Sequence, residues 1–175
     1  MKHFCVFAFL LTWLMAGRAL ATQPEELVAT IHGAAERYGV PPLLLEAIAI
    51  CEGGNRGRLE PWAVNVGGKS LFPASKAEAL AIIHDAARRG QSYDIGVMQI
   101  NDWWLWRFDL QPEQVIEPEV NALIGSWIMG DEIRRRGMTW EAVASYHHPL
   151  KRDRERGWKY ALRVAAVLEK LVNNQ

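Results

Sequence analysis

Apolar residues recur every three or four positions along most of this chain, which is the spacing that one buried face of an α-helix produces. Turn residues, mostly glycine and proline, separate the periodic segments. Helices are predicted over residues 24–39, 41 or 42 to 52, 75–90, about 98–108, 118–137, 139–148 and 154–172, with a short helical turn at Pro112. Residues 55–74 are predicted to form a loop that holds a small hairpin near 62–66. The pattern therefore predicts one mainly helical domain with a small loop and hairpin insert.

The N-terminal segment has the pattern of a signal peptide. Lys2 and His3 precede an apolar run over residues 4–16, and residues 19–21 (Ala-Leu-Ala) have the small-x-small form of a signal peptidase site. The run is short for a bilayer span, although an uncleaved anchor is the alternative. We therefore expect residues 1–21 to be a signal peptide, residues 22–175 to be the mature domain, and the protein to be periplasmic.

The charge balance excludes several classes of partner. Without Lys2 and Arg18 the expected mature chain keeps 18 of its 20 basic residues, against 20 acidic ones. A nearly neutral chain gives no reason to expect a nucleic-acid partner or stable membrane insertion after signal cleavage. Cys51 is then the one cysteine left, so we expect no internal disulfide and interpret Cys51 as a small buried apolar residue.

Glu52 stands at the end of the second predicted helix. It closes an apolar run over residues 43–51, and Gly53 and Gly54 follow it. Glycine is common just past a helix end, so Glu52 is expected on the last turn. The negative end of the helix dipole and desolvation both disfavour an ionised carboxylate there, which suits a general acid. A solvated glutamate before a turn is the simpler alternative.

Three further segments follow Glu52 in a fixed order. Together with the segment that contains Glu52, they form a series of four: residues 50–54 (Ile-Cys-Glu-Gly-Gly), 61–68 (Pro-Trp-Ala-Val-Asn-Val-Gly-Gly), 94–101 (Asp-Ile-Gly-Val-Met-Gln-Ile-Asn) and 142–147 (Ala-Val-Ala-Ser-Tyr-His). This ordered series resembles the lytic transglycosylases of the soluble-transglycosylase (SLT) type. It is most similar to their small, specialised branch associated with conjugation, secretion and pilus machines. The resemblance covers roughly residues 41–148, and the third segment is its most specific part.

The resemblance implies a fold and an activity. The implied fold is lysozyme-like α+β, mainly helical, with a sugar-binding cleft. The implied reaction cleaves the β-1,4 bond between N-acetylmuramic acid and N-acetylglucosamine in peptidoglycan and forms a 1,6-anhydro product, without a cofactor. The implied partners are glycan strands and components of a conjugation or secretion machine, for which the enzyme would open the wall locally.

The resemblance also implies roles for particular residues. Glu52 would carry out both proton transfers, and Met98 and Gln99 would line the cleft beside it. Tyr146 would approach Glu52 and donate a hydrogen bond to its carboxylate. If residues 98–108 form a helix, Gln99 and Asn101 point to different sides of it, so one can contact substrate while the other caps or is solvated. Met98 as a core residue and Tyr146 as a core tyrosine are the alternatives.

Two residues depart from the family pattern. Gly53 stands where the family usually has Ser, and His147 stands where it has Asn. We expect Gly53→Ser to be tolerated, unless Gly53 adopts a left-handed backbone conformation. The missing Ser favours a non-catalytic wall-binding or assembly subunit, whereas the presence of Glu52, Gln99 and Tyr146 together opposes it.

A second catalytic carboxylate is not obvious in the sequence. Ordinary glycosidases use two carboxylates, and Asp94, Asp102 and Asp131 are the candidates to partner Glu52. Asp94 is expected to cap the Gln99 motif instead. A single acid is consistent with the anhydro-forming reaction that the resemblance implies, whereas a second carboxylate across the cleft would favour a hydrolytic muramidase.

Other conspicuous side chains are expected to be structural. Four tryptophans, Trp62, Trp103, Trp104 and Trp106, are interpreted mostly as core residues, and Trp103 and Trp106 share a helical face. The alternative is that one or two of them line sugar subsites, since sugar rings stack on aromatic faces. His147 and His148 are adjacent and cannot easily bind one ion together, so no metal site is expected.

Overall fold

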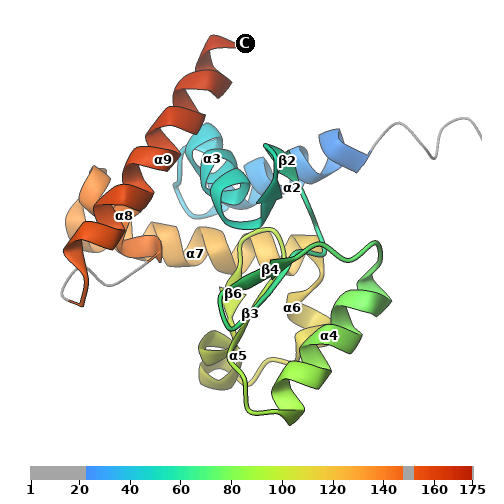
Figure 1. Ribbon diagram of the computed structural model, residues 1–175. Coiled ribbons are helices and arrows are strands. Elements are labelled where there is room, and N and C mark those ends of the chain that lie inside the picture. The colour runs from blue at the N-terminus through green and yellow to red at the C-terminus, as the bar shows by residue number, and fades with distance from the viewer. Residues whose placement is uncertain (1–22, 148–151, 175) are drawn as a thin grey trace, which may run out of the picture.

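The computed structural model describes residues 23–147 and 152–174, and Figure 1 labels its helices and strands. The predicted signal segment and the predicted helix break at Pro149 lie outside the described residues. None of the helices in the two described ranges is long and apolar enough to cross a membrane.

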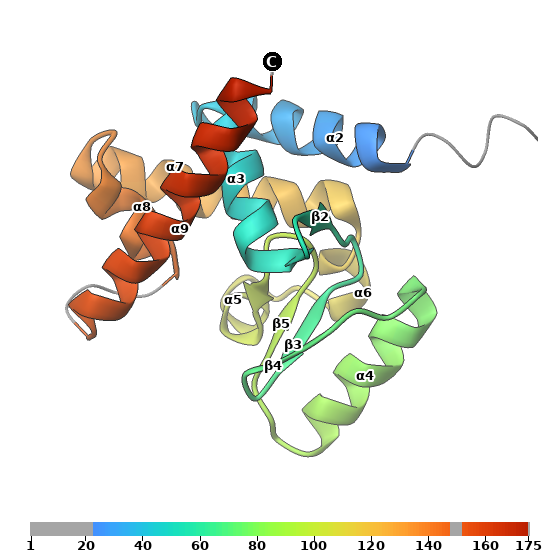
Figure 2. The ribbon, with the colours of Figure 1, turned by 45° about the horizontal axis from the view of Figure 1, so that its top comes forward.

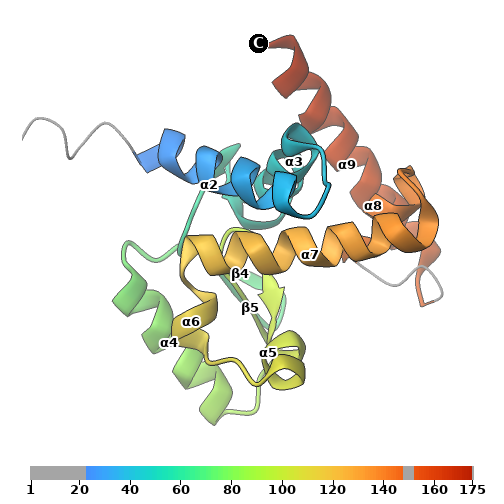
Figure 3. The same cartoon turned by 180° about the vertical axis from the view of Figure 1, so that it is seen from behind.

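Five helices pack into a helical lobe, visible in the upper part of Figure 1 and from behind in Figure 3. They are α2 (Gln23–Arg37), α3 (Pro42–Gly53), α7 (Pro118–Arg136), α8 (Trp140–His147) and α9 (Arg154–Asn173). Helix α3 contacts α2 and α9, and α8 contacts α7 and α9. Helix α7 runs along the base of this lobe and reaches the strands below it (Figure 3).

A small antiparallel sheet forms the second lobe (Figure 2). Its strands, in the order β4-β3-β5-β6, are β4 (Lys69–Leu71), β3 (Val64–Val66), β5 (Tyr93–Ile95) and β6 (Ile100–Asn101). Helix α4 (Lys76–Arg88) packs on β3 and β5, and the short helices α5 (Asp102–Phe108) and α6 (Pro112–Val115) follow β6. Strands β1 (Gly54–Asn55) and β2 (Arg58–Leu59) form a separate hairpin directly after α3.

One apolar core joins the two lobes. Ile48 of α3, Ile95 of β5 and Met129 of α7 are each 0 % exposed and belong to the same cluster of buried side chains. Burial of this kind is the main driving force for folding. The end of α3, which carries Glu52, is therefore held in place by packing against the sheet and against α7.

The fold class is confirmed: the domain is mainly helical, with a small strand-containing insert of the lysozyme-like kind. The predicted helix start at Ser75 and helix end at Gly137 both agree with the structure. Ser75 accepts a hydrogen bond from the Glu78 backbone N–H at 3.2 Å, as a helix N-cap does. Gly137 ends α7 with a positive φ, which is common for glycine at this position. The predicted hairpin exists, but it pairs β3 with β4 and starts at Val64.

The predicted helix over residues 98–108 is wrong in its first part. Residues 96–99 form a turn between β5 and β6, and α5 begins only at Asp102. Gly96 and Gln99 have φ values of 74° and 47°, so both lie in the left-handed region that ends regular structure. Val97, Met98 and Ile100 are apolar because the turn and the start of β6 are buried, and not because they form one face of a helix.

One expected core face points to solvent. Trp103 is 49 % exposed and Trp106 is 79 % exposed, so the face they share on α5 is not a core face. On α9, the apolar residues Leu162 and Val172 are also exposed. The buried row of α9 instead includes Tyr160, because the helix is turned toward α3 and α8.

Candidate active site

Glu52 lies on the last turn of α3, and its side chain is 12 % exposed. The helix ends here because the chain turns into β1 at Gly54, which has extended φ and ψ angles. The end of α3 meets the Gly96–Gln99 turn of the sheet lobe, since the Gly53 Cα faces the backbone of Val97. A nearly buried carboxylate thus sits at the junction of the two lobes.

The His147 side chain lies within hydrogen-bonding distance of Glu52. Its Nδ1 lies 3.3 Å from the Glu52 Oε1, although the two residues are 95 positions apart. The His147 ring stacks on the Tyr160 ring, with centroids 4.6 Å apart and planes 11° apart. This stacking fixes the imidazole plane, so His147 can hold the carboxylate in one orientation.

Tyr160 is a buried neighbour of this pair that the sequence pattern did not single out. The residue is 1 % exposed, and its hydroxyl has no hydrogen-bond partner of good geometry within the described residues. Burial and the nearby Glu52 charge hold the Tyr160 pKa well above its usual value. The hydroxyl therefore stays protonated and is available as a donor toward the carboxylate.

Asn121 of α7 organises the Gly96–Gln99 turn from below. Its side chain is fully buried and accepts a hydrogen bond from the Met98 backbone N–H at 2.8 Å. It donates at 2.9 Å to the carbonyls of Ile95 and Val115. A side chain at Gly96 would displace this amide, because a Cβ there would lie 2.5 Å from the Asn121 nitrogen. Asn121 looked like any polar residue on a helix, so sequence analysis missed it.

Gln99 lies at the end of this turn, beside the sheet. Its side-chain N–H₂ donates to the Gly96 carbonyl at 2.7 Å and to the Ala63 carbonyl at 3.3 Å. These bonds fix the amide group and leave its carbonyl oxygen as the group that can accept a bond from a substrate. The role of Gln99 as a substrate contact stays a prediction, now with a fixed side-chain orientation.

Met98 and Asn101 have structural contacts that the sequence did not reveal. The Met98 side chain is fully buried and packs against Gly125, which does not support a direct substrate contact. The Asn101 oxygen caps α5 by accepting from the Trp103 N–H, and its nitrogen donates to Asp94 at 2.8 Å. The predicted substrate contacts of both residues stay predictions.

The Tyr146 hydroxyl does not donate to Glu52, contrary to expectation. It donates to the Met98 carbonyl at 3.2 Å and so ties α8 to the Gly96–Gln99 turn. Burial, together with the Glu52 charge, holds the pKa of Tyr146 well above its usual value. Tyr146 thus lies near Glu52 and supports the turn that borders it.

Tyr146→Phe should lower wall cleavage about fivefold to tenfold, because a hydrogen bond of this kind contributes roughly 1 kcal/mol. The ring still packs, so the melting temperature should fall by only about 2–4 °C, the shift expected for one such bond. The measurement is the initial rate of muropeptide release from purified sacculi, with Tyr38→Phe, just after the C-terminal end of α2, as control. Rates equal to wild type would make Tyr146 a core tyrosine without influence on the site.

The three candidate second carboxylates differ in their surroundings. Asp131 pairs with Arg134 and Arg135 on α7, and Asp102 accepts from Ser92 at 2.8 Å on the surface. Asp94 of β5 is partly buried, and desolvation raises its pKa despite the Asn101 hydrogen bond. The Glu52 charge raises it further. Asp94 thus accepts a hydrogen bond from the Asn101 side chain. Among the described residues, no backbone N–H of the Gly96–Gln99 turn donates to it, so it does not cap the Gln99 motif as expected.

Gly53 is required by packing, which overturns the expectation that Ser would be tolerated there. A Cβ at position 53 would lie 2.5 Å from the Val97 carbonyl oxygen and 2.7 Å from the Val97 Cα. Both atoms are backbone and cannot move aside as a flexible side chain could. Gly53, which stands where the family usually has Ser, is therefore found where α3 and the Gly96–Gln99 turn approach each other closely.

Cys51 precedes Glu52 and is half-buried and unpaired among the described residues. Burial raises the pKa of its thiol above the ordinary value. This is consistent with the structural role predicted for it.

Comparison with protein families identifies this arrangement. The model of the transglycosylase SLT domain matches residues 29–160, which is more than half of the chain. The chain belongs to the transglycosylase SLT family. The match spans α3, the Gly96–Gln99 turn and α8, so the SLT domain includes every candidate site residue described above. No curated protein sequence matches the chain significantly.

Membership of the SLT family indicates which general reaction this protein catalyses. SLT domains are peptidoglycan lytic transglycosylases, so the substrate class is peptidoglycan. Such enzymes generally act outside the cytoplasm.

Proposed function

We propose that this protein is a lytic transglycosylase in which Glu52 is the single catalytic acid and base. The observation that carries the proposal is a nearly buried carboxylate at the lobe junction, held by His147 at 3.3 Å and bordered by the Gly96–Gln99 turn. This placement combines low exposure with one fixed orientation, as general acid–base catalysis requires.

In the first step, protonated Glu52 gives its proton to the glycosidic oxygen as the bond between N-acetylmuramic acid and N-acetylglucosamine breaks. Positive charge then develops at C1 of the muramic acid, and the substrate's own acetamido oxygen stabilises it. The fixed carbonyl oxygen of Gln99 is oriented to accept a hydrogen bond from the bound sugar. The Tyr160 hydroxyl can stabilise the carboxylate left on Glu52.

In the second step, ionised Glu52 removes the proton of the C6 hydroxyl, and O6 attacks C1. This closes the 1,6-anhydro ring and returns Glu52 to its protonated form. The attacking hydroxyl belongs to the same sugar, so its effective concentration is far above that of any external nucleophile in solution. The anhydro muropeptide should therefore be lighter by one water than a hydrolysis product, which mass spectrometry of digested sacculi measures directly.

A second candidate function is hydrolysis, and Asp94 is the observation that favours it. The Asp94 pKa is raised by burial and also by the Glu52 charge, so the two carboxylates lie near enough to influence each other. A second carboxylate is what a hydrolytic muramidase needs to activate water or to stabilise the intermediate. The Asn101 hydrogen bond occupies one Asp94 oxygen and opposes a role as base. If digestion yields reducing muramic acid ends, this function replaces the first.

The remaining assignments concern the biological setting. We propose that residues 1–21 are a signal peptide, that residues 22–175 act in the periplasm, and that the enzyme opens the wall for a conjugation or secretion machine. The support is the N-terminal sequence pattern and the resemblance to the small specialised branch. Detection of a mature chain that starts at Thr22 in the periplasmic fraction tests the first two points. In-cell crosslinking to machine components tests the third.

A non-catalytic wall-binding subunit was the other alternative, and its one supporting feature was the missing Ser after Glu52. The close contact between Gly53 and Val97 gives this glycine a packing reason, so its presence does not by itself favour a binding role. No observation now favours a purely binding role.

A further inference from the structure

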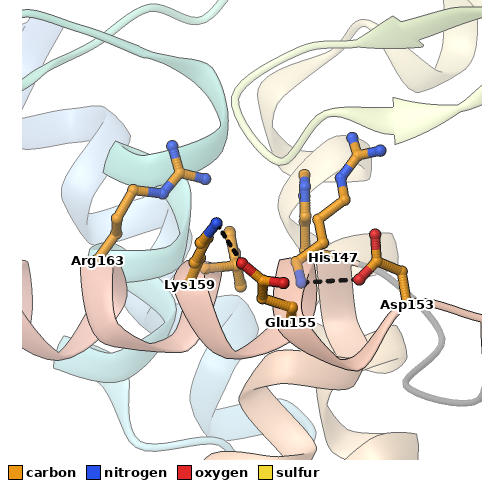
Figure 4. Close-up of a pocket in the computed structure, with 7 residues that line it drawn as sticks. His147, Asp153, Glu155, Lys159 and Arg163 are labelled. Carbon is orange, nitrogen blue, oxygen red and sulfur yellow. Dashed lines mark hydrogen bonds and ion pairs between the residues drawn. The ribbon is translucent and has the colours of Figure 1, made fainter.

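A charged pocket lies directly beside Glu52, between α8 and α9. Its volume is about 380 Å³, and Figure 4 shows the side chains that line it. They are His147, Asp153, Glu155, Arg156, Lys159, Tyr160 and Arg163. His147 and Tyr160 also border Glu52, so the pocket begins where the catalytic site ends.

The two acids of this pocket already have partners. Glu155 forms an ion pair with Lys159 at 2.6 Å, and Asp153 caps α9 by accepting from the Arg156 backbone N–H at 3.0 Å (Figure 4). These contacts leave the acids little capacity to bind a further cation.

The two arginines of the pocket have no acidic partner in the part of the chain that the structure describes. Among the described residues, neither the Arg156 nor the Arg163 guanidinium forms an ion pair, and residues 148–151 contain no acid. The Arg163 guanidinium lies 5.5 Å above the Tyr160 ring and is near enough to α3 to lower the Cys51 pKa against the effect of burial. Guanidinium groups bind carboxylates with paired, charge-assisted hydrogen bonds. The pocket therefore has the chemistry of a carboxylate site.

We propose that this pocket binds a carboxylate of the peptide attached to the muramic acid residue. This inference rests on the proposed function and specifies its substrate further. The scissile bond belongs to the muramic acid, and that sugar carries a short peptide with free carboxylates. A sugar placed at Glu52 brings this peptide next to His147 and Tyr160. Arg156 and Arg163 then select strands that still carry acidic peptides and help to orient the sugar.

The test compares soluble glycan strands carrying native peptides with the same strands whose carboxylates have been converted to methylamides. Wild-type protein should cleave the native strands with a kcat/KM about fivefold higher, as expected for exposed charge-assisted contacts. The double variant Arg156→Gln/Arg163→Gln should lose this preference and cleave both substrates at the lower value. The double variant Arg152→Gln/Arg154→Gln is the matched control, because these exposed arginines lie outside the pocket and their removal changes the net charge equally. The control should keep the wild-type preference.

A binding measurement separates failure of this inference from failure of the proposed function. The affinity for both kinds of strand is measured with the Glu52→Gln variant and with the pocket and control variants that carry this substitution. These proteins are expected to bind the strands without cleaving them. Equal affinity for native and methylamidated strands, or equal losses in the pocket and control variants, would overturn the inference. A wild-type protein that binds native strands more tightly but cleaves neither substrate would overturn the proposed function alone. Strands stripped of peptide by an amidase expose the lactyl carboxylate instead. If they bind as tightly as native strands, the assignment to the peptide is wrong.

Discussion

Glu52→Gln should reduce the release of muropeptides from purified sacculi by about 10²–10⁴-fold, the contribution typical of a general acid–base group. The amide keeps the shape and the hydrogen bond to His147 at 3.3 Å but cannot supply a proton. Both proton transfers of the reaction depend on this one carboxylate, so little residual activity is expected. Folding should be unaffected, because the side chain lies at the lobe junction and is not part of the apolar core.

Glu46→Gln is the matched control for that substitution. Glu46 is a second low-exposure carboxylate of α3, two turns earlier, and it pairs with His32 at 2.7 Å away from the sheet lobe. Its replacement should leave the cleavage rate within about twofold of wild type, even if it lowers stability. A Glu52→Gln variant that digests sacculi at the Glu46→Gln rate would remove Glu52 from the mechanism.

Gly53→Ser should be destabilising and should impair cleavage at least tenfold. A Cβ at this position would overlap the Val97 backbone, since the contact distance would be 2.5 Å. Overpacking of this kind costs about 1–3 kcal/mol, or roughly 3–10 °C in melting temperature for a domain of this size. Relief of the overlap requires the end of α3 to move away from the Gly96–Gln99 turn, which displaces Glu52 as well.

Gly33→Ser is the matched control for Gly53→Ser. It shows the effect of replacing a helical glycine where no overlap with a neighbouring backbone occurs. Gly33 is exposed on α2, and a Cβ there would meet no atom within 4 Å. Serine has the higher helix propensity, so this control should melt at or slightly above the wild-type temperature. Thermal unfolding followed by circular dichroism measures both variants. A Gly53→Ser protein with unchanged melting and higher activity would mean that the turn adapts, as the family pattern alone suggested.

The sequence predicted those features that local chemistry determines. Two glycines end an apolar helix directly after Glu52, which located this residue, and the helix limits at Ser75 and Gly137 agree with the predicted ranges. The order of motifs gave the family, which the match over residues 29–160 confirms.

Features that depend on contacts between distant segments could not be predicted. His147 meets Glu52 across 95 positions, and Asn121 reaches the Met98 N–H from another helix. Neither of these hydrogen bonds produces a periodic pattern in the sequence from which it could be predicted. The turn at residues 96–99 was misread as helix because an apolar run is compatible with either structure when it is buried. The conformation at Gln99, with a φ of 47°, depends on the hydrogen bonds that its side chain makes to two carbonyls.

Digestion of purified sacculi in ¹⁸O-water, followed by mass spectrometry of the soluble muropeptides, tests the central claim most directly. If Glu52 acts alone and O6 of the muramic acid is the nucleophile, the products end in 1,6-anhydro-muramic acid and contain no solvent oxygen. Reducing muramic acid ends that carry one ¹⁸O atom would contradict this account. They would show that water attacks C1, as in a hydrolase in which Asp94 assists Glu52.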